Sequence, residues 1–480
     1  MGLRIANAHL LKKLAMKTLI KNGRIVTAAD EYVADLLIDG ETIRLIGAQL
    51  DPALADTVID ATGLYVLPGG IDVHTHLSMP WRGIESCDDF FTGQRAALFG
   101  GTTTHVDFSI QPKGGTLRQA LDLWHAKAAG KAVSDYGFHV AITDLTDAVM
   151  AEIAELPKWG VTSIKMFMAY KDSLQVDDLT LFKSMQVAAK SGVLSLVHAE
   201  NGDAIEVLIA QALEAGNHAP IYHALTRPPE LEAEATARAI WLAQVAGDAP
   251  LFVVHCTCEG ALAAVSAARA RGQHAYAETC IHYLFFTKDD LLGTDDDPFN
   301  GAKYVCSPPL RELHDQTALW RGLRTGEITS LSTDHCPWNY QEQKELGRES
   351  FAKIPNGAPG IEDRLYMLWD AGVRAGTLTP SRFVELVATN PAKLFGLYPK
   401  KGTIAVGSDA DLVLWDDAAK HTVRAQTHHS AIDYNLFEGY QVTGKPVKVF
   451  VRGRLVVDGE QLLAKPGSGQ FVHRTSPLLL

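Results

Sequence analysis

Residues 69–76 have the sequence Gly-Gly-Ile-Asp-Val-His-Thr-His, a short apolar run that ends in two histidines. In a β-strand, side chains two residues apart point to the same face, so His74 and His76 can reach one metal ion together. Imidazole is a good ligand for zinc, and a carboxylate or a hydroxide can complete the coordination shell. This stretch therefore predicts a metal site at the end of a strand.

Four more potential ligands close or follow short apolar, β-branched runs further along the chain. They are Lys165, His198, His255 and Asp334. Either histidine alone would more often be a hydrogen-bonded core residue, and an aspartate after a strand is more often a helix N-cap. The pattern formed by all six residues at strand ends favours a two-metal hydrolase site.

Lys165 fits such a site only after a chemical change, because a protonated ammonium cannot bind a cation. Burial beside metals lowers the pKa of a lysine, and the free amine can then add carbon dioxide to form a carbamate. The carbamate has two anionic oxygens, which can bridge two ions and still leave the centre with a net positive charge. The alternative is an ordinary strand lysine whose ammonium reaches a carboxylate.

The middle of the chain alternates strand and helix patterns, which is typical of a (β/α)8 barrel. The helix patterns include residues 204–215 and 232–245, each followed by a glycine. The eight predicted strands are Tyr65–Val73, Thr102–Phe108, Gly137–Thr143, Ser163–Met168, Leu194–His198, Leu251–His255, His274–Thr279 and Ile328–Thr333. Such barrels carry their chemistry at the carboxyl ends of the strands, where the six candidate ligands fall.

The two chain ends share a different pattern of short strands and turns. Asn22-Gly23 and Asp39-Gly40 are pairs typical of hairpin turns. The strand-like runs are Thr18–Ile20, Gly23–Val26, Asp35–Ile38, Thr42–Ile46, Thr57–Asp60, Asp411–Trp415, Val447–Val451 and Leu455–Val457. We therefore expect an α/β protein with a TIM barrel over residues 67–400. Residues 1–66 and 401–480 would together form a small β-sandwich domain, with a tail at the C-terminus.

Composition and charge argue against several classes of protein. The 480 residues are 47% hydrophobic and 21% charged, as in a globular enzyme. The net charge of −12 argues against a nucleic-acid partner. No apolar run approaches the ~18 residues needed to cross a bilayer, and the six scattered cysteines fit a reducing, cytoplasmic location. The basic N-terminus has no clear cleavage site, so we expect an extended start before Met16, with a transit segment as the alternative.

Seven segments of the chain resemble the cyclic-amidohydrolase branch of the amidohydrolase superfamily, the branch of dihydropyrimidinase and D-hydantoinase. The resemblance runs from about Met16 to the C-terminus. The segments that carry it are Pro68–His76, Asp88–Gly93, Ser163–Lys171, Val197–Gly202, Cys306–Arg311, Ser332–Pro337 and Pro355–Glu362. The set is highly specific as a group.

The resemblance implies two Zn²⁺ ions per subunit. The more buried ion would be held by His74, His76 and Asp334. The other ion would be held by His198 and His255. Lys165, N6-carboxylated, would bridge the two ions. Tyr170 would hydrogen-bond the substrate carbonyl and its oxyanion. Ser307 and Asn356 would bind a cyclic imide largely through backbone atoms. The resemblance also implies a homotetramer that acts on a small cyclic amide or imide.

The implied activity is that of a dihydropyrimidinase, which opens 5,6-dihydrouracil or dihydrothymine to an N-carbamoyl-β-amino acid, with activity on 5-substituted hydantoins. A hydroxide bridging the two metals would attack the ring amide carbonyl. One metal and Tyr170 would stabilise the oxyanion. Asp334, as general base and then acid, would move a proton from the water to the departing ring nitrogen.

Three alternatives stay open: a D-hydantoinase, an allantoinase-like cyclic amidase, and a non-enzymatic adaptor of the collapsin-response-mediator type. Such adaptors lack parts of the metal set, whereas all six positions are filled here. Dihydroorotase-like relatives carry an arginine two residues after the second histidine, where this chain has Ser78, so a substrate carboxylate is not expected there. Met79, Trp81 and Ile84 in the following loop would accept an apolar ring substituent. Phe167 would add another apolar wall.

Overall fold

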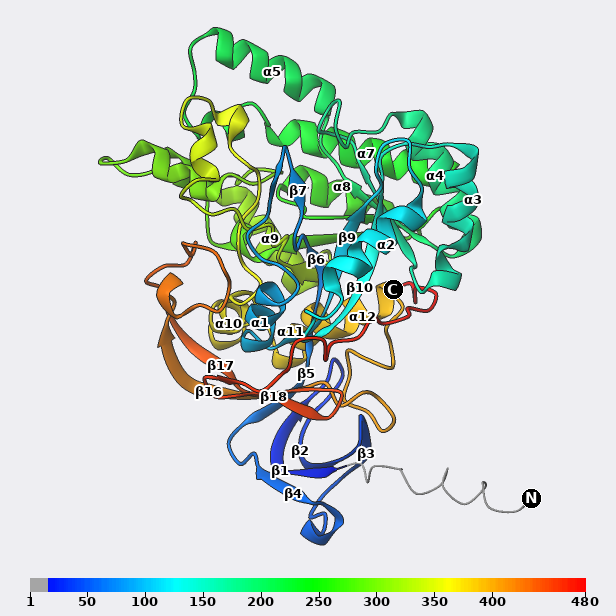
Figure 1. Cartoon of the computed structure of the whole chain (residues 1–480), viewed down its shortest axis with the longest axis vertical. Helices are drawn as coiled ribbons and strands as arrows, with labels where there is room; N and C mark the ends of the chain where they lie inside the picture. The colour runs from blue at the N-terminus through cyan, green and yellow to red at the C-terminus, as the bar shows by residue number, and fades with distance from the viewer. Residues whose placement is uncertain (1–15) are drawn as a thin grey trace, which may run out of the picture.

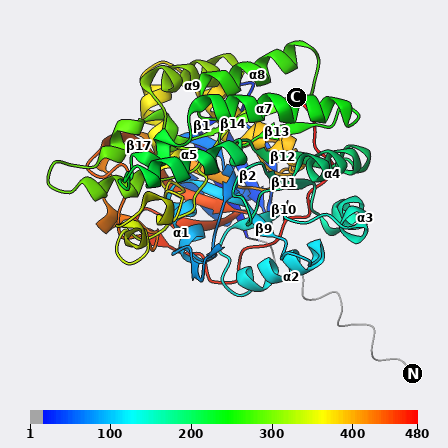
Figure 2. The same cartoon turned by 90° about the horizontal axis from the view of Figure 1, so that it is seen from above.

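The computed structural model describes residues 16–480, so the predicted extended start at residues 1–15 lies outside the described part of the chain. Eight parallel strands form a nearly closed barrel in the hydrogen-bonded order β15-β14-β13-β12-β11-β10-β9-β6, as predicted (Figures 1 and 2). These strands are β6 (Gly70–Thr75), β9 (Thr102–Ile110), β10 (Asp135–Ile142), β11 (Ser163–Phe167), β12 (Leu194–His198), β13 (Leu251–Val253), β14 (Ala275–Cys280) and β15 (Ser330–Ser332). Because the strands are parallel, all their carboxyl ends lie at one end of the barrel.

Helices surround the barrel, as the view from above shows (Figure 2). Within residues 16–480, the α-helices are α1 (Thr92–Phe99), α2 (Leu117–Ala128), α3 (Asp147–Glu155), α4 (Asp178–Ser191), α5 (Gly202–Glu214), α6 (Tyr222–Leu225), α7 (Pro229–Val245), α8 (Glu259–Ala270), α9 (Leu313–Thr325), α10 (Arg364–Leu368), α11 (Pro380–Val384) and α12 (Asn390–Leu394). The two helices named from the sequence correspond to α5 and α7. Asn201 caps α5 by accepting the Ala204 N–H at 3.2 Å, and Gly216 follows the helix with a φ of 80°.

The prediction of one strand over Tyr65–Val73 is wrong, because the chain changes sheets within it. β5 (Tyr65–Pro68) pairs with β1 and β16 in the sheet of the chain ends, whereas β6 begins the barrel at Gly70. Gly69 lies at the change, where a Cβ would stand 2.0 Å from Thr103 Oγ1. Only glycine lets the backbone pass this close to β9, so the Gly-Gly pair positions the strand that carries the two histidines.

The two chain ends build one mixed sheet of nine strands below the barrel (Figure 1). The strands bond in the order β19-β18-β17-β16-β5-β1-β2-β3, with β4 beside β1. Besides β5, they are β1 (Lys17–Val26), β2 (Glu31–Asp39), β3 (Thr42–Gly47), β4 (Thr57–Asp60), β16 (Leu412–Thr422), β17 (Gln441–Val451), β18 (Arg454–Asp458) and β19 (Gln461–Leu462). The sheet folds back on itself, since Thr42 of β3 bridges Asp409 just before β16. Side chains from both ends, among them Ile20 and Leu412, pack inside this fold.

The predicted hairpin at Asn22-Gly23 is also wrong, because both residues lie within the single strand β1. The pairing of β1 with β2 shifts register between Ile20 and Gly23, which marks a bulge. Asn22 has a φ of 61°, its N–H donates to Asp35 at 2.8 Å, and its side-chain amide donates to Asp60 at 3.1 Å. The Asn-Gly pair thus marks a left-handed bulge residue, whereas Asp39-Gly40 forms the predicted turn between β2 and β3.

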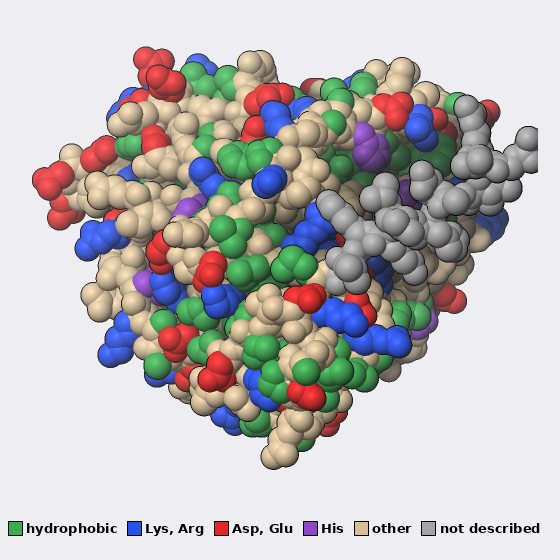
Figure 3. Space-filling view, turned by 60° about the horizontal axis from the view of Figure 1, so that its bottom comes forward, with side chains coloured by type: hydrophobic (Ala, Val, Ile, Leu, Met, Phe, Trp, Pro, Cys, Tyr) green, Lys and Arg blue, Asp and Glu red, His purple; other side chains and the backbone are tan. Residues whose placement is uncertain are grey.

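One face of the molecule shows charges of both signs. Figure 3 shows Lys and Arg side chains interspersed with Asp and Glu, and apolar side chains between them. No helix within residues 16–480 is long and apolar enough to span a membrane. The apolar C-terminal tail lies against the barrel of its own chain, where the Leu478 N–H donates to Lys393 O at 2.8 Å and the Leu480 N–H to the Tyr276 hydroxyl at 3.0 Å.

A buried arginine joins the first and last strands of the barrel. Between β6 and the chain after β15, the strand pairing is limited to one isolated bridge from Thr75 to His335. Arg364, at the start of α10, is fully buried, and its Nη1 donates to Ile71 O at 2.9 Å and to Leu331 O at 2.8 Å. The guanidinium therefore closes the barrel where direct backbone pairing is sparse.

We expect Arg364→Met to destabilise the fold by about 3–5 kcal/mol, because two strand carbonyls and the nearby buried Asp72 carboxylate lose their cationic partner. Thermal unfolding of the metal-loaded protein should show this as a lower melting temperature. The control is Arg118→Met, which removes an exposed ion pair with Asp122 and a contact of the guanidinium with the Trp159 ring. Equal melting temperatures for the two variants would contradict a role of Arg364 in closing the barrel.

Candidate metal centre

The six predicted ligands are buried together at the carboxyl ends of the barrel strands. They are His74 in β6, His76 just beyond it, Lys165 in β11, His198 at the end of β12, His255 after β13 and Asp334 after β15. The fold therefore brings into one place side chains that are spread over more than half of the chain. The strands that carry them are adjacent or nearly adjacent in the barrel, which fixes their spacing.

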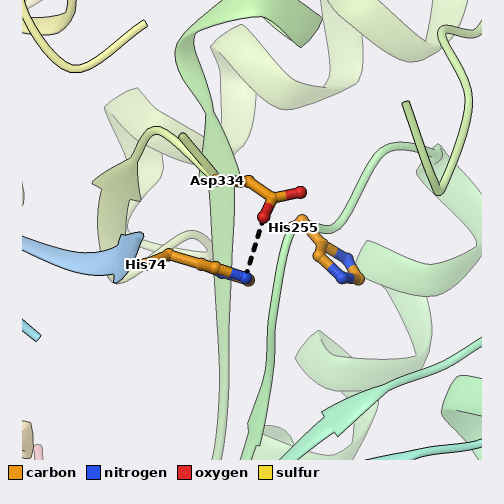
Figure 4. A group of neighbouring side chains, drawn as sticks. All are labelled: His74, His255 and Asp334. Atoms are coloured by element: carbon orange, nitrogen blue, oxygen red, sulfur yellow. Dashed lines mark ion pairs between the residues drawn. The ribbon is translucent and has the colours of Figure 1, made fainter. Parts of the chain in front are cut away.

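One group of ligand atoms converges on the Asp334 carboxylate. His74 Nε2 lies 3.1 Å from Asp334 Oδ1, and His76 Nε2 lies 3.0 Å from the same oxygen. His74, His255 and Asp334 each offer one ligand atom, and these three atoms lie within 4.8 Å of one another. Figure 4 shows the His74 ring directed at the Asp334 carboxylate, with the His255 ring beside them. Ligand atoms this close together can surround one divalent ion.

His198 and His255 form a second group. His198 Nδ1 and His255 Nε2 face each other at 2.9 Å. Two imidazole nitrogens in this position either share a proton or direct both lone pairs at one ion. The other nitrogen of His198, Nε2, lies 2.7 Å from Glu200 Oε2, and this carboxylate fixes the orientation of the ring.

Lys165 is buried without any hydrogen-bond partner for its Nζ within residues 16–480. Nζ lies 4.8 Å from the centre of the Phe108 ring and 5.0 Å from that of Phe167. Burial lowers the pKa of Lys165 to about 7, although the carboxylates of Asp334 and Glu278 act in the opposite direction. A large fraction of free amine is therefore present at neutral pH, and this is the form that can react with carbon dioxide.

Glu278 is a site residue that the sequence analysis missed. It is wholly buried in β14, and its Oε1 contacts His74 Nδ1 and accepts the His255 N–H at 3.3 Å. Its Oε2 accepts a hydrogen bond from Ser332 Oγ at 2.8 Å. A carboxylate behind a ligating imidazole fixes the tautomer and leaves Nε2 free for an ion. The sequence did hold one signal for Glu278, a single acidic residue within a predicted apolar strand. A glutamate buried in such a strand needs a partner, which here is a ligand histidine.

The carboxylates set the proton affinity of the centre. Burial alone would lower the pKa of His74, but Asp334 and Glu278 together raise it to about 9. Burial lowers the pKa of His76 and holds that of His255 well below the usual range. Burial would raise the pKa of Asp334, but His74 and His76 outweigh it and hold that pKa well below its ordinary value. The centre thus offers an ionised Asp334 carboxylate and neutral imidazoles at His76 and His255, whereas His74 carries an extra proton that a metal would displace.

Three residues of the site have backbone conformations that L-amino acids rarely adopt. The φ angles of Tyr170, His255 and Asp334 are 69°, 40° and 49°. Each residue follows a barrel strand, at the point where the chain turns over the mouth of the barrel. Left-handed conformations at non-glycine residues cost free energy and cluster at functional sites, which supports a functional role for this end of the barrel.

A cavity opens beside the ligands, and the three predicted substrate-binding residues line it. These are Tyr170, Ser307 and Asn356. Asn356 Nδ2 donates to Ser307 Oγ at 3.1 Å, and His223 Nε2 lies 3.1 Å from the same hydroxyl. Burial raises the pKa of Tyr170, and the Ser307 and Asn356 side chains offset only part of this effect. The tyrosine therefore stays protonated as a hydrogen-bond donor.

Apolar side chains form the rest of the cavity wall. Met79, Trp81 and Phe167 line it, in the positions predicted to contact a ring substituent. Ile84 is not among the lining residues, because it pairs with Trp81 in the hairpin of β7 (Pro80–Trp81) and β8 (Ile84–Glu85). Trp338, which the sequence analysis did not single out, also lines the cavity and packs near Trp81 with ring centroids 6.0 Å apart.

The chain is similar over nearly its whole length to known amidohydrolases. The Amidohydrolase family profile matches residues 65–456. A D-hydantoinase of Geobacillus stearothermophilus is 53% identical over 460 residues, which cover 96% of this chain and 97% of the relative. A D-hydantoinase of Rhizobium radiobacter is 49% identical over 459 residues, covering 96% and 99%. The crystal structure of dihydropyrimidinase from Brevibacillus agri NCHU1002 superposes with a TM-score of 0.94 at 51% identity, covering 96% and 99%.

We expect Glu278→Gln to weaken metal retention about 10–100-fold, because a neutral amide replaces the charge that orients His74 and supports its basicity. The metal content left after dialysis against graded chelator concentrations measures this effect. Glu460→Gln is the control, since Glu460 is an exposed acid paired only with Lys445. Retention equal to that of the control would show that Glu278 does not support the ligands.

Proposed function

The chain belongs to the amidohydrolase family, and we propose that it is a cyclic amide hydrolase of the dihydropyrimidinase and D-hydantoinase type. The observation that carries the proposal is the set of imidazoles and carboxylate that converges beside a cavity lined by Tyr170, Ser307 and Asn356. The reaction is the hydrolytic opening of a cyclic amide to an N-carbamoyl amino acid. The names of the relatives support this activity, and they include both enzyme types.

The donor set fits two divalent ions, which we propose to be zinc because imidazole-rich sites suit this metal. One ion would be held by His74, His76 and Asp334. The other would be held by His198 and His255, and carboxylated Lys165 would bridge the two. The unpartnered, buried amine of Lys165 supports the carbamate, which would give this side chain its missing partners. When bound, such ions supply an activated water and a Lewis acid for the carbonyl.

Tyr170 donates a hydrogen bond to the substrate carbonyl oxygen as that oxygen becomes an oxyanion. Its raised pKa keeps the hydroxyl protonated, and a donor aimed at the developing charge can lower the barrier by several kcal/mol. The rings of His198 and Phe167 lie 5.2 Å and 6.0 Å from the tyrosine ring, centre to centre. These contacts hold the hydroxyl on the side of the cavity where the ligands lie.

Asp334 carries the proton between the attacking water and the leaving nitrogen. Its low pKa leaves the carboxylate ionised at neutral pH, so it can accept a proton from the water. The residue lines the cavity, and its carboxylate faces the same space as the Tyr170 side chain. After the attack, Asp334 delivers this proton to the ring nitrogen, which leaves as the free amino end of the carbamoyl group.

The backbone of Ser307 and Asn356 is complementary to a cyclic imide. Within residues 16–480, the Ser307 N–H, the Ser307 C=O and the Asn356 N–H make no hydrogen bond. Unpaired backbone groups at a cavity wall call for a partner from the ligand or from water. An imide presents one N–H between two carbonyls, which matches one acceptor and two donors. The apolar wall near Met79 and Trp81 would then face the ring substituent.

Three finer features stay predictions from the sequence. They are a homotetrameric assembly, a cytoplasmic location and the domain boundaries after residues 66 and 400. The physiological ring, whether dihydrouracil, dihydrothymine or a hydantoin, also stays open, because the same imide contacts serve all three. An allantoinase-like activity is less favoured, since Ser78 stands where related enzymes carry an arginine for a substrate carboxylate.

We expect the zinc-loaded protein to hydrolyse dihydrouracil or hydantoin with a kcat/KM above ~10⁴ M⁻¹s⁻¹ in steady-state assays. Lys165→Ala should lose both bound metal and turnover, because the bridge between the ions is removed. Lys288→Ala, which affects only an exposed ion pair with Glu312, is the control. Two bound ions without turnover of either substrate would overturn the proposed function, and full activity of Lys165→Ala would overturn the bridge.

Tyr170→Phe should lower kcat about 10²–10³-fold, because the lost donor acts mainly on the charge that develops in the transition state. KM should change much less. The comparison uses initial rates with hydantoin, and Tyr32→Phe, at a half-exposed residue of the terminal sheet, serves as the control. A kcat equal to that of the control variant would remove Tyr170 from the mechanism.

A further inference from the structure

A single buried lysine bonds to both of the loops that carry Ser307 and Asn356. Lys344 opens a short 3₁₀ helix, η6 (Lys344–Gly347), and is fully buried. Its Nζ donates to three carbonyl oxygens, those of Val305 at 2.8 Å, Pro355 at 2.7 Å and Gly357 at 2.8 Å. The first of these residues lies two positions before Ser307, and the other two flank Asn356 on either side.

Stability alone does not account for this arrangement. All three hydrogen bonds of the Lys344 side chain go to neutral carbonyls, and burial lowers the pKa of this lysine to about 7. By contrast Lys401, which is also buried, makes ion pairs with three aspartates, Asp135, Asp409 and Asp411. Burying a cation without an anion is costly, and an apolar side chain of similar volume is often at least as stabilising. What the Lys344 amino group does achieve is to fix three carbonyls from two separate loops around one atom.

Other buried groups complete this frame around Asn356. Trp338 Nε1 donates to Asn356 O at 2.9 Å, so three consecutive carbonyls, from 355 to 357, are bound to buried donors. The Gly357 N–H donates to Val305 O at 3.0 Å and ties the two loops directly. Gly357 has a φ of 141°, and a Cβ there would lie 2.3 Å from Cys336 O, so only glycine fits.

The peptide between Pro355 and Asn356 shows how Lys344 can aim a donor. In a trans peptide, the C=O and the following N–H point in opposite directions. Because Lys344 binds the Pro355 C=O, the Asn356 N–H points away from the lysine. Asn356 lines the cavity, and its N–H makes no hydrogen bond within residues 16–480. The lysine therefore sets the direction of a backbone donor that it does not touch.

We propose that Lys344 is a positioning residue that holds the Asn356 amide and the Ser307 segment at the spacing of one cyclic imide. This inference rests on the proposed function of the cavity. Lys344 acts through the backbone and is separate from the side chains that would bind metal. Its loss should loosen contacts that the substrate makes in the ground state and in the transition state alike. KM should therefore rise more than kcat falls.

Hydrogen–deuterium exchange tests the positioning role without relying on activity. In Lys344→Met, peptides that cover residues 303–310 and 354–360 should exchange about tenfold faster than in the wild-type protein. Lys288→Met is the control, because it removes only an exposed ion pair with Glu312. Unchanged exchange in the two segments, or acceleration of the same size throughout the chain of Lys344→Met, would overturn the proposal. If Lys344→Met does not fold, Lys344→Gln, which keeps two N–H donors on a shorter side chain, should show a smaller change in the same direction.

Kinetics with hydantoin and dihydrouracil test the consequence for binding. KM of Lys344→Met should rise about 10–100-fold, the order expected when binding groups shift by about 1 Å, while bound metal stays at the wild-type level. An unchanged KM, or a loss of metal that accounts for the lost activity, would contradict the positioning role. If the wild-type protein hydrolyses neither substrate, the proposed function fails, and the exchange comparison still decides whether Lys344 holds the two loops.

Discussion

Four imidazoles and the three carboxylates of Asp334, Glu278 and Glu200 are buried together at the carboxyl ends of the barrel strands, where each unpaired lone pair raises the free energy of the fold. Glu278 and Glu200 supply some of the missing partners, since Glu278 binds Nδ1 of His74 and Glu200 binds Nε2 of His198. The other nitrogen of each ring lies on the side of the remaining ligands and of the Lys165 amine. A pair of divalent ions and a carbamate on Lys165 would satisfy these remaining groups at once, so the proposed metal centre would stabilise the arrangement that binds it.

At the other wall of the cavity, buried partners orient backbone groups in the same way as they orient the imidazoles. In a trans peptide the C=O and the N–H point in opposite directions, so a buried group that binds the C=O directs the N–H toward the cavity. His223 binds the Cys306 carbonyl at 2.8 Å, and this orients the following Ser307 N–H. Lys344 does the same for the Asn356 N–H. Both walls of the cavity thus depend on buried partners behind them, namely Glu278, Glu200, His223 and Lys344.

These buried partners also mark the limit of what the sequence could predict. The eight barrel strands and the residues at their ends follow from apolar runs with a polar terminus, a local pattern that needs no knowledge of the fold. Glu278 and Lys344 carry no such pattern, because their roles depend on contacts with residues far away in the chain. Asn22-Gly23 misled for a related reason: the pair fixes a left-handed residue, but tertiary pairing decides whether a turn or a bulge results. Ser307 and Asn356 came from the family resemblance alone, since recognition through backbone atoms leaves almost no mark on residue type.

Recognition through the backbone has a consequence for specificity. In the proposed mode of binding, the imide core would meet backbone groups whose positions are set by Lys344, His223 and the loop geometry, and these do not depend on the side chains at the cavity wall. The ring substituent would meet Met79, Trp81 and Phe167, which line the cavity from other segments. In this mode of binding, ring chemistry and substituent choice would be carried by different parts of the structure. Substitutions in the apolar wall can change which substituent is accepted while the metal ligands and the imide contacts keep their geometry.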